Sequence, residues 1–517
     1  MERDGILESI WQSEVKHYGQ EIIDPSPKYD VMIVGAGITG ITSALMLQKK
    51  GLNCILAEAS NMGFGTTGGT TAHLNNFFDT PYHQVIKDYN LDSAKLLYQG
   101  AKEVHDIIKD NINTYQIYCD YTTRSGYLFS LDEEQDKELD NIIDGHIKVG
   151  LDTFEIEVNP FGIPSVRVIE VPGQAQFHPL KYLRILLKEF ISLGGVFVEN
   201  CRVTSVEKKI DDLDKIDEAV DKKDNLVVET SKGAVVCKNL IYATHIPPGR
   251  NVMHFRNVAY RSYVMAVKLR NGNYPEALGY DLFEPFHYYR THILDGEHFL
   301  IAGGEDHKTG DVDNHADSFE RLENYISQHF DIESIEYKWS SQFYEPADGL
   351  PYIGQLPGSP DNVYCATGYS GNGMIFGTLA AKTLSDIIST GDSIYKDLFA
   401  PSRIKPVAGF TNVIKAAGHA IKHMVVDKLS IDNIDKLNEI ERSEGKVISY
   451  DGKTLAVYKD ALGKNHIVQS DCTHLYCTVQ WNNIEKSWDC PCHGSRFGTD
   501  GEVLNGPAVK KLKYYDT

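Results

Sequence analysis

The chain is poor in basic residues and has no long hydrophobic run. Its 517 residues carry 51 Lys and Arg against 72 Asp and Glu, a net charge of −21. Such a charge repels phosphate backbones, so we expect no nucleic acid partner. No apolar stretch approaches the ~18 residues that cross a bilayer, and the first residues show no signal peptide or twin-arginine signal. We therefore expect a cytoplasmic protein.

Cysteine is also scarce, except near the end of the sequence. Four of the nine cysteines fall between residues 472 and 492. Clustering of this kind favours a metal site over a disulfide framework. The apolar and charged fractions, 42% and 24%, are ordinary for a globular protein and exclude wholesale disorder.

The first glycine-rich segment predicts a dinucleotide site. Residues 29–34 form an apolar, β-branched run that is typical of a buried parallel strand. The sequence GAGITG follows, in which Gly35 makes a tight turn, Gly37 lets the backbone approach a pyrophosphate and Gly40 lets the next helix pack closely. A second predicted strand ends at Glu58, whose carboxylate can accept hydrogen bonds from an adenosine ribose.

A Gly/Thr-rich stretch at residues 63–74 can wrap a pyrophosphate or a flavin edge with its backbone N–H groups. The alternative interpretation of this stretch is a flexible surface turn. The glycine loop by itself does not separate NAD from FAD, so both cofactors stay open at this level.

Four later segments follow in a characteristic order: 174–207, 240–245, Trp339–Gly354 and Tyr364–Gly377. In that order they resemble the D-amino-acid oxidase superfamily of FAD enzymes, over residues 28–403 in total. The resemblance implies FAD bound without a covalent link, because Gly69 stands where some relatives have a flavin-linking histidine. It also implies a set of FAD-contacting residues, namely Gly35, Ala36, Gly37, Ile38, Thr39, Gly40, Glu58, Thr66, Thr67, Val203, Thr244, Gly368, Gly371, Asn372, Gly373 and Met374.

The last of these segments also has a physical reason to bind a flavin. Gly368, Gly371 and Gly373 free the backbone at the start of a helix that is predicted to begin near Met374. The positive end of such a helix can stabilise negative charge on a reduced flavin.

The cysteine cluster predicts a metal centre. Its spacing is Cys472-x-His474, then fifteen residues, then Cys490-x-x-His493, which presents two thiolates and two imidazoles from paired loops. Such a set suits the two irons of a [2Fe–2S] cluster, although the bare spacing also allows tetrahedral zinc. The flanking sequences DCTHLYC and CPCHGS resemble the loops of high-potential Rieske domains and favour the iron–sulfur cluster.

The Rieske resemblance implies further roles. Cys477 and Cys492 correspond to the two cysteines whose disulfide ties the loops together, and Ser495 to the serine that hydrogen-bonds a cluster sulfide. Residues 506–508 resemble the loop that covers the cluster. Phe497 departs from the pattern, because the respiratory proteins have a tyrosine there, so we expect a potential below the top of the Rieske range.

These segments together predict an α/β FAD-binding domain of the glutathione-reductase-like Rossmann type, an interleaved α+β substrate domain and a C-terminal all-β Rieske domain. The expected boundaries are an N-terminal extension at 1–27, an FAD-dependent oxidoreductase module at 28–403, a linker helix at 404–438 and the Rieske domain at 439–517. Within the module we expect FAD-binding segments at about 28–90, 170–250 and 340–403, and substrate-domain segments at about 91–169 and 251–339.

Residues 410–429 place apolar side chains on one face of a predicted helix, with lysines and histidines away from it. This pattern favours an interdomain helix packed on the body of the protein, because aromatic anchors are few. A peripheral contact with an anionic membrane, or with a partner, is the alternative.

The predicted strand at 280–292 carries the candidate substrate residues. Arg290 can clamp a substrate carboxylate, with a hydroxyl group from Tyr289 or Tyr288, and its alternative role is a structural ion pair. Side chains alternate along a strand, so only one of these tyrosines can share the face of Arg290. His287 is a weaker catalytic candidate, because most histidines are simply satisfied polar groups.

The leading hypothesis is a dehydrogenase of an amine or amino acid. It predicts hydride transfer to the flavin and single-electron transfer through the Rieske cluster to an external acceptor, either a protein or a quinone. Two alternatives stay open: a reductase fed by the cluster, and a non-catalytic electron-transfer or redox-sensing subunit.

Overall fold

The computed structural model describes residues 3–12, 19, 28–208, 225–312, 314–404, 432–433, 439–450 and 452–515. The helix predicted at 410–429 lies outside the described residues, so both of its interpretations stay predictions. Within the described part of the chain, no helix combines the length and the apolar character that crossing a membrane requires.

The first sheet has eight strands and a parallel centre. Six of them follow one another in the order β16 (Tyr352–Gln355), β17 (Val363–Thr367), β10 (Gly233–Tyr242), β1 (Tyr29–Val34), β2 (Cys54–Ala57) and β7 (Val196–Val198). Two more extend it through the first half of β10, namely β9 (Leu226–Thr230) and, beyond it, β8 (Val203–Lys208). All of β2 and most of β1 are buried, which accounts for their continuous apolar sequences.

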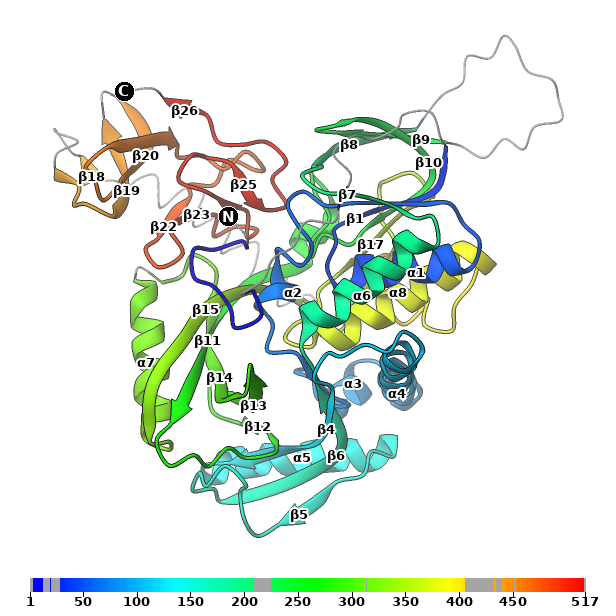
Figure 1. Ribbon diagram of the computed structural model, residues 1–517, viewed down its shortest axis with the longest axis vertical. Helices are drawn as coiled ribbons and strands as arrows, with labels where there is room; N and C mark the ends of the chain where they lie inside the picture. The colour runs from blue at the N-terminus through cyan, green and yellow to red at the C-terminus, as the bar shows by residue number, and fades with distance from the viewer. Residues whose placement is uncertain are drawn as a thin grey trace.

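Three helices lie side by side next to this sheet (Figure 1): α1 (Ile38–Lys49), α6 (Pro179–Ser192) and α8 (Gly373–Thr390). The glycine loop joins β1 to α1, so α1 begins at the carboxyl end of the central strand. This is the edge of an open parallel sheet where nucleotides bind.

The second sheet has nine strands and comes from segments interleaved with those of the first. Its order is β15 (Ile332–Pro346), β11 (Asn257–Leu269), β14 (Glu297–Lys308), β13 (Tyr288–Leu294), β12 (Leu278–Asp281), β4 (Thr122–Ser130), β6 (Arg167–Gln176) and β3 (His73–Leu74), with β5 (Phe154–Ile156) paired to β6. The helical segments of this part are α2 (Thr66–Gly69), α3 (Tyr82–Asp88), α4 (Leu91–Thr114), α5 (Glu133–Val149), η1 (Val252–Phe255) and α7 (His315–Ser327).

The C-terminal part consists of two small sheets without a described helix. The first has the order β18 (Asp432–Asn433), β19 (Glu444–Tyr450), β20 (Lys453–Lys459), β21 (Asn465–Gln469) and β26 (Tyr514–Tyr515). The second has the order β22 (Gln480–Asn482), β23 (Ser487–Asp489), β24 (Arg496–Phe497) and β25 (Val503–Asn505). The predicted fold class, α/β and interleaved α+β followed by an all-β domain, is confirmed.

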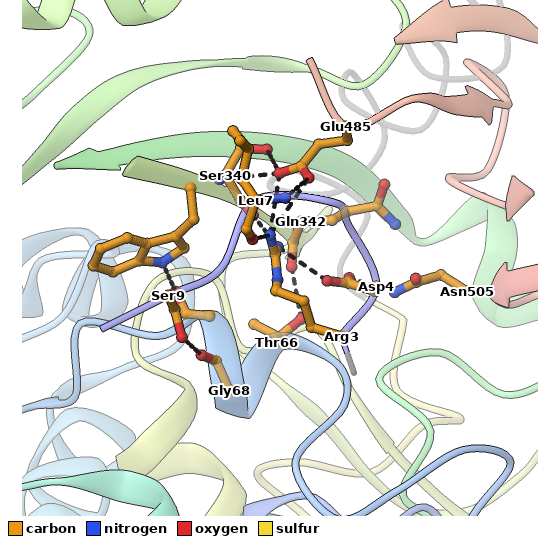
Figure 2. A network of polar contacts seen from close by, with 12 residues as sticks. Arg3, Asp4, Leu7, Ser9, Thr66, Gly68, Ser340, Gln342, Glu485 and Asn505 are labelled. Atoms are coloured by element: carbon orange, nitrogen blue, oxygen red, sulfur yellow. Dashed lines mark hydrogen bonds and ion pairs between the residues drawn. The ribbon is translucent and has the colours of Figure 1, made fainter. Parts of the chain in front are cut away.

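Residues 3–12, here called the N-terminal strap, lie between the C-terminal domain and the rest of the chain (Figure 2). Arg3 forms an ion pair with Glu485 at 3.3 Å and donates a hydrogen bond to the carbonyl of Ser340 at 2.5 Å. Glu485 also accepts a hydrogen bond from the Ser340 hydroxyl at 2.6 Å. The strap therefore joins the C-terminal domain to strand β15 of the second sheet.

The same network continues inside the C-terminal domain. Asp4 of the strap pairs with Arg496 at 3.3 Å, Arg496 pairs with Asp489 at 3.0 Å, and Asp489 pairs with Arg261 of β11 at 3.5 Å. With Arg3 and Glu485, this makes three guanidinium groups and three carboxylates, all of them buried. Burial by itself would raise the pKa of Glu485, but the arginines outweigh it and lower that pKa to about 2.

Further along, the strap contacts the Gly/Thr-rich segment. The Ser9 hydroxyl donates to the carbonyl of Gly68 at 2.6 Å, and the Trp11 indole N–H donates to the carbonyl of Thr70 at 2.6 Å. The strap thus holds two distant parts of the chain at once, the C-terminal domain and the end of α2 with the residue that follows it.

Replacing Arg3 by Met should lower the free energy of unfolding by about 3–5 kcal/mol, because Glu485 would keep a buried charge with less compensation. Urea denaturation followed by tryptophan fluorescence measures the effect. The matched control is Lys511→Met, which removes the cation of the exposed Lys511–Glu502 pair in the same domain and should change that free energy by less than about 0.5 kcal/mol. Equal, small effects of both substitutions would contradict a docking that depends on the buried network.

Candidate functional site

A cavity of about 1250 Å³ lies between the two large sheets and reaches the C-terminal domain. Twelve of the sixteen predicted FAD-contacting residues line it: Gly35, Gly37, Ile38, Thr39, Glu58, Thr66, Thr67, Thr244, Gly371, Asn372, Gly373 and Met374. The segments that the sequence separates by more than 300 positions therefore meet around one space, which is the arrangement that a dinucleotide requires.

The other four predicted residues lie behind this lining. A side chain at Gly40 would clash with the carbonyl of Gly35, so Gly40 serves the close packing of α1 against β1. Ala36 donates its N–H to the Glu58 carboxylate at 2.8 Å. Val203 is buried in β8, and Gly368 has a φ of +75° in the turn before α8.

Both helix starts at the cavity fit an anionic cofactor. The N-cap residues of α1 and α8, Gly37 and Asn372, make no side-chain cap, and neither helix has an acidic residue in its first turn. The first residues, Ile38 and Gly373, line the cavity, and the Ile38 N–H donates to the Thr67 hydroxyl at 3.2 Å. Helix N-termini with free N–H groups attract phosphate and other negative groups. A side chain at Gly37 would come within 2.9 Å of the Thr67 hydroxyl, so only glycine leaves room for a ligand there.

The cavity continues beyond these motifs into a pocket on the second sheet. Its wall carries Tyr260, Ser262, Tyr280, Tyr288, Asp306, Phe343 and Glu345. Tyr280 donates to the side-chain oxygen of Asn75 at 2.8 Å and lies 2.8 Å from Nδ1 of His73. Tyr280 has a single hydroxyl proton and donates it to Asn75, so the hydrogen bond with His73 must be donated by Nδ1 of the imidazole. In this tautomer Nε2 of His73 carries no proton and is an acceptor. Burial keeps the pKa of His73 well below its usual value.

The predicted substrate residue Arg290 does not line the cavity. Its side chain is fully buried, and Nη1 donates to the carbonyls of Thr71 and Ala72 at 2.6 and 3.2 Å. The Trp11 ring of the strap lies 5.4 Å from the guanidinium. Burial lowers the pKa of Arg290 to about 9. This geometry fits a structural role, in which Arg290 fixes the backbone beside the Gly/Thr-rich segment.

The other two predicted catalytic residues, His287 and Tyr289, also lie away from the cavity wall. His287 Nδ1 lies 2.9 Å from Asp281, and its Nε2 lies 3.6 Å from Glu305. Tyr289 is buried under the sheet and donates to Asp281 at 3.5 Å. Neighbouring side chains of a strand point to opposite faces, so Tyr289 points away from the cavity and Tyr288 faces it. The Tyr288 hydroxyl lies 2.9 Å from the Ser262 hydroxyl.

The predicted cluster ligands converge in the C-terminal domain. Cys472 and Cys490 are buried and free, whereas Cys477 and Cys492 form the disulfide that the Rieske resemblance implied. The rings of His474 and His493 lie 5.1 Å apart, and Nδ1 of each is buried without a hydrogen-bond partner. Two free thiols and two unpartnered imidazole nitrogens fit a cluster with two sulfur and two nitrogen ligands.

The edge of the domain that carries these histidines packs against the FAD-binding module beside the large cavity. Nε2 of His474 lies 3.1 Å from the carbonyl oxygen of Gly249. The Tyr344 hydroxyl donates to the carbonyl of His493 at 3.2 Å. The Gln342 side chain donates to the carbonyl of Gly494 at 2.9 Å. Both histidines are nearly closed off, with exposed fractions of 4% and 5%.

One loop of the C-terminal domain also belongs to the cavity wall. Leu504, Asn505 and Gly506 line the cavity, and the adjacent Pro507 accepts a hydrogen bond from the Gly249 N–H at 3.0 Å. Sequence reasoning missed Gly249, Gln342 and Tyr344, because these residues act only through the docking of two domains. The one signal in the sequence was the loop at 506–508, which was expected to cover the cluster.

Comparison with known proteins agrees with both halves of this arrangement. The FAD dependent oxidoreductase (DAO) family matches residues 30–387. The chain belongs to this family. The Rieske [2Fe-2S] domain matches residues 432–516. The chain is therefore an FAD-dependent oxidoreductase with a C-terminal Rieske domain, and the predictions of FAD and of a Rieske-type [2Fe–2S] cluster are confirmed.

Three relatives show how far the similarity extends. YhfW of Bacillus subtilis, a Rieske 2Fe-2S iron-sulfur protein by its name, is 32% identical over 98% of this chain and 97% of its own. The gamma-glutamylputrescine oxidoreductase of Escherichia coli is 27% identical over 74% of this chain and 88% of its own. The crystal structure of glycine oxidase from Geobacillus kaustophilus superposes with a TM-score of 0.59 at 17% identity, covering 73% and 99% of the two chains, and supports the fold.

Replacing His287 by Asn should weaken folding and leave flavin chemistry intact. Burial lowers the pKa of His287, but hydrogen bonds to Asp281 and Glu305 outweigh it and raise that pKa. A histidine whose pKa is higher in the folded than in the unfolded protein stabilises the fold. This stabilisation is complete below the pKa of the unfolded state, about 6.5, and is lost as the pH rises through the pKa of the folded state. The variant should therefore lose about 1–3 kcal/mol of unfolding free energy at pH 6 and less at pH 9.

Chemical denaturation at the two pH values, together with anaerobic flavin reduction, tests this prediction. The control is His466→Asn, which breaks the more exposed His466–Asp460 pair. A large loss of flavin reduction with unchanged stability would instead assign His287 a catalytic role.

Proposed function

We propose that the protein oxidises an amine or amino acid at FAD and passes the electrons singly through the Rieske cluster to an external acceptor. The observation that carries the proposal is the docking of the histidine edge of the Rieske domain against the FAD module, beside the cavity. Leu504, Asn505 and Gly506 share the cavity wall with the FAD motifs, and His474 contacts Gly249 a few residues beyond the lining residue Thr244.

When bound, FAD supplies a two-electron oxidation, the removal of a hydride from the carbon beside an amine nitrogen, and the cluster supplies transfer of one electron at a time. The residues of this chain bind and orient the groups that react. The start of α8 stabilises negative charge at the flavin end, and the lone pair on His73 Nε2 can accept a hydrogen bond from the substrate amine and orient it. The relatives named for gamma-glutamylputrescine and glycine support an amine or amino acid as the substrate.

The docked interface also limits where the acceptor can bind. His474 and His493 are covered by the FAD module, so the acceptor cannot reach the histidine edge in this arrangement. Tyr476, next to the disulfide residue Cys477, is 56% exposed. We place the acceptor contact on that side of the Rieske domain.

Replacing Cys472 by Ser tests the direction of electron flow. Wild-type protein, mixed anaerobically with amines and amino acids, should lose flavin absorbance and develop a Rieske-type signal in electron paramagnetic resonance. The variant should still lose flavin absorbance but show no such signal, because the cluster lacks one thiolate. The control is Cys119→Ser, which alters a buried free cysteine outside both sites and should keep both signals.

Two results would count against the proposal. A Rieske-type signal that appears with a chemical reductant, while none of the substrates changes the flavin, would favour the non-catalytic alternative. Oxidation of the flavin by a bound compound in protein reduced beforehand would favour the reductase.

A further inference from the structure

The cavity wall is strongly acidic. Among the described residues that line it, nine are Asp or Glu, none is Lys and a single one, Arg202, is Arg. Arg202 belongs to the dinucleotide end, because it acts electrostatically on Glu58 and donates to the carbonyl of Val503. The pocket on the second sheet thus presents carboxyl groups without a guanidinium or an ammonium of its own in the lining.

Asp306 and Glu345 are the carboxyl groups built into the pocket wall. Asp306 lies near the end of β14 and contacts the Ser262 hydroxyl, which lies 2.9 Å from that of Tyr288. One carboxyl oxygen of Asp306 is buried and has no hydrogen-bond partner. Glu345 lies near the end of β15 and hydrogen-bonds Tyr260. Neither carboxyl group belongs to an ion pair among the described residues.

Asp79, which also lines the cavity, acts electrostatically on both groups, and Glu345 acts on Asp306. Burial, together with repulsion from Asp79 and Glu345, raises the pKa of Asp306 to about 8. Burial and repulsion from Asp79 raise the pKa of Glu345 to about 7, although Lys308 opposes this shift without lining the cavity. Buried carboxyl groups that repel one another favour a bound cation. The cation offsets the repulsion between them and gives the unpaired carboxyl oxygen a partner.

Aromatic rings complete the pocket wall. Tyr260 and Phe343 stack at a centroid distance of 5.7 Å and both line the cavity, as do Tyr280 and Tyr288. Aromatic faces attract ammonium groups and not carboxylates. Arg290, the guanidinium expected to clamp a carboxylate, is enclosed and bonded to backbone carbonyls. The pocket therefore has the chemistry to bind a cation, and its lining offers no Lys or Arg to pair with a carboxylate.

We propose that the substrate is a diamine without a carboxylate, whose second ammonium group pairs with Asp306 and Glu345. This inference rests on the proposed function. The nitrogen beside the reacting carbon has to be neutral for oxidation, so the cation that the two carboxylates hold belongs to a second group. Asp306 and Glu345 act as specificity residues that bind the end of the substrate away from the reacting carbon.

The test compares α,ω-diamines with three to six carbons against monoamines and ω-amino acids of the same chain lengths. Flavin reduction is measured anaerobically with the holoenzyme, and binding is measured separately by titration calorimetry. The diamines should bind and reduce the flavin at lower concentrations than the other two series, by about 10- to 100-fold, as expected for one charge-assisted contact.

Two variants assign the effect to the pocket. Asp306→Asn and Glu345→Gln should weaken diamine binding by about 10- to 100-fold with a smaller change in the maximal rate, and should reduce the preference over monoamines. The control is Glu336→Gln, which removes an exposed carboxylate from the same strand as Glu345 and should change neither quantity.

The outcomes separate the inference from the proposed function. Flavin reduction by amino acids or monoamines in preference to diamines would overturn the inference and leave the proposed function standing. Diamine binding that depends on Asp306 without flavin reduction would support the pocket chemistry and overturn the proposed function. The absence of both binding and reduction would overturn both.

Discussion

The buried ionic network of Arg3, Asp4, Arg261, Glu485, Asp489 and Arg496 decides how the two halves of the protein are joined. Three positive and three negative side chains are removed from water together, and their desolvation is offset only when every partner is in place. The network links the N-terminal strap, the second sheet and the Rieske domain. A partly formed interface would leave a buried charge uncompensated, so the docked arrangement is favoured as a whole.

The position of the Rieske domain, in turn, defines the functional cavity. Once docked, the domain contributes Leu504, Asn505 and Gly506 to the wall and turns its histidine edge toward Gly249 and Tyr344. The strap also supports the end of α2 through Ser9 and the residue after it through Trp11. The same ten residues therefore stabilise both the interface with the cluster and the loop that borders the flavin end.

The parts of this protein that sequence could predict are those with local chemistry. The turn at Gly35, the clash that excludes a side chain at Gly40, and the Cys472 and Cys490 loops each depend on a few neighbouring residues. The role of Arg290, in contrast, depends on its contacts with the Trp11 ring and the carbonyl of Thr71. Both groups come from segments that are distant from Arg290 in the sequence. Likewise, no local sequence pattern around Glu485 or Arg3 predicts that these residues form an ion pair, because they are 482 positions apart.

That separation has a consequence for the order of biogenesis. Arg3 cannot meet Glu485 until the ribosome has added the 482 residues that follow Arg3, so the strap closes after the Rossmann-type sheet has had time to form. In the docked protein His474 and His493 are nearly closed off from solvent. The contacts that hold the strap against the Rieske domain are therefore among the last that the growing chain can form, and they complete an interface in which both histidines are covered.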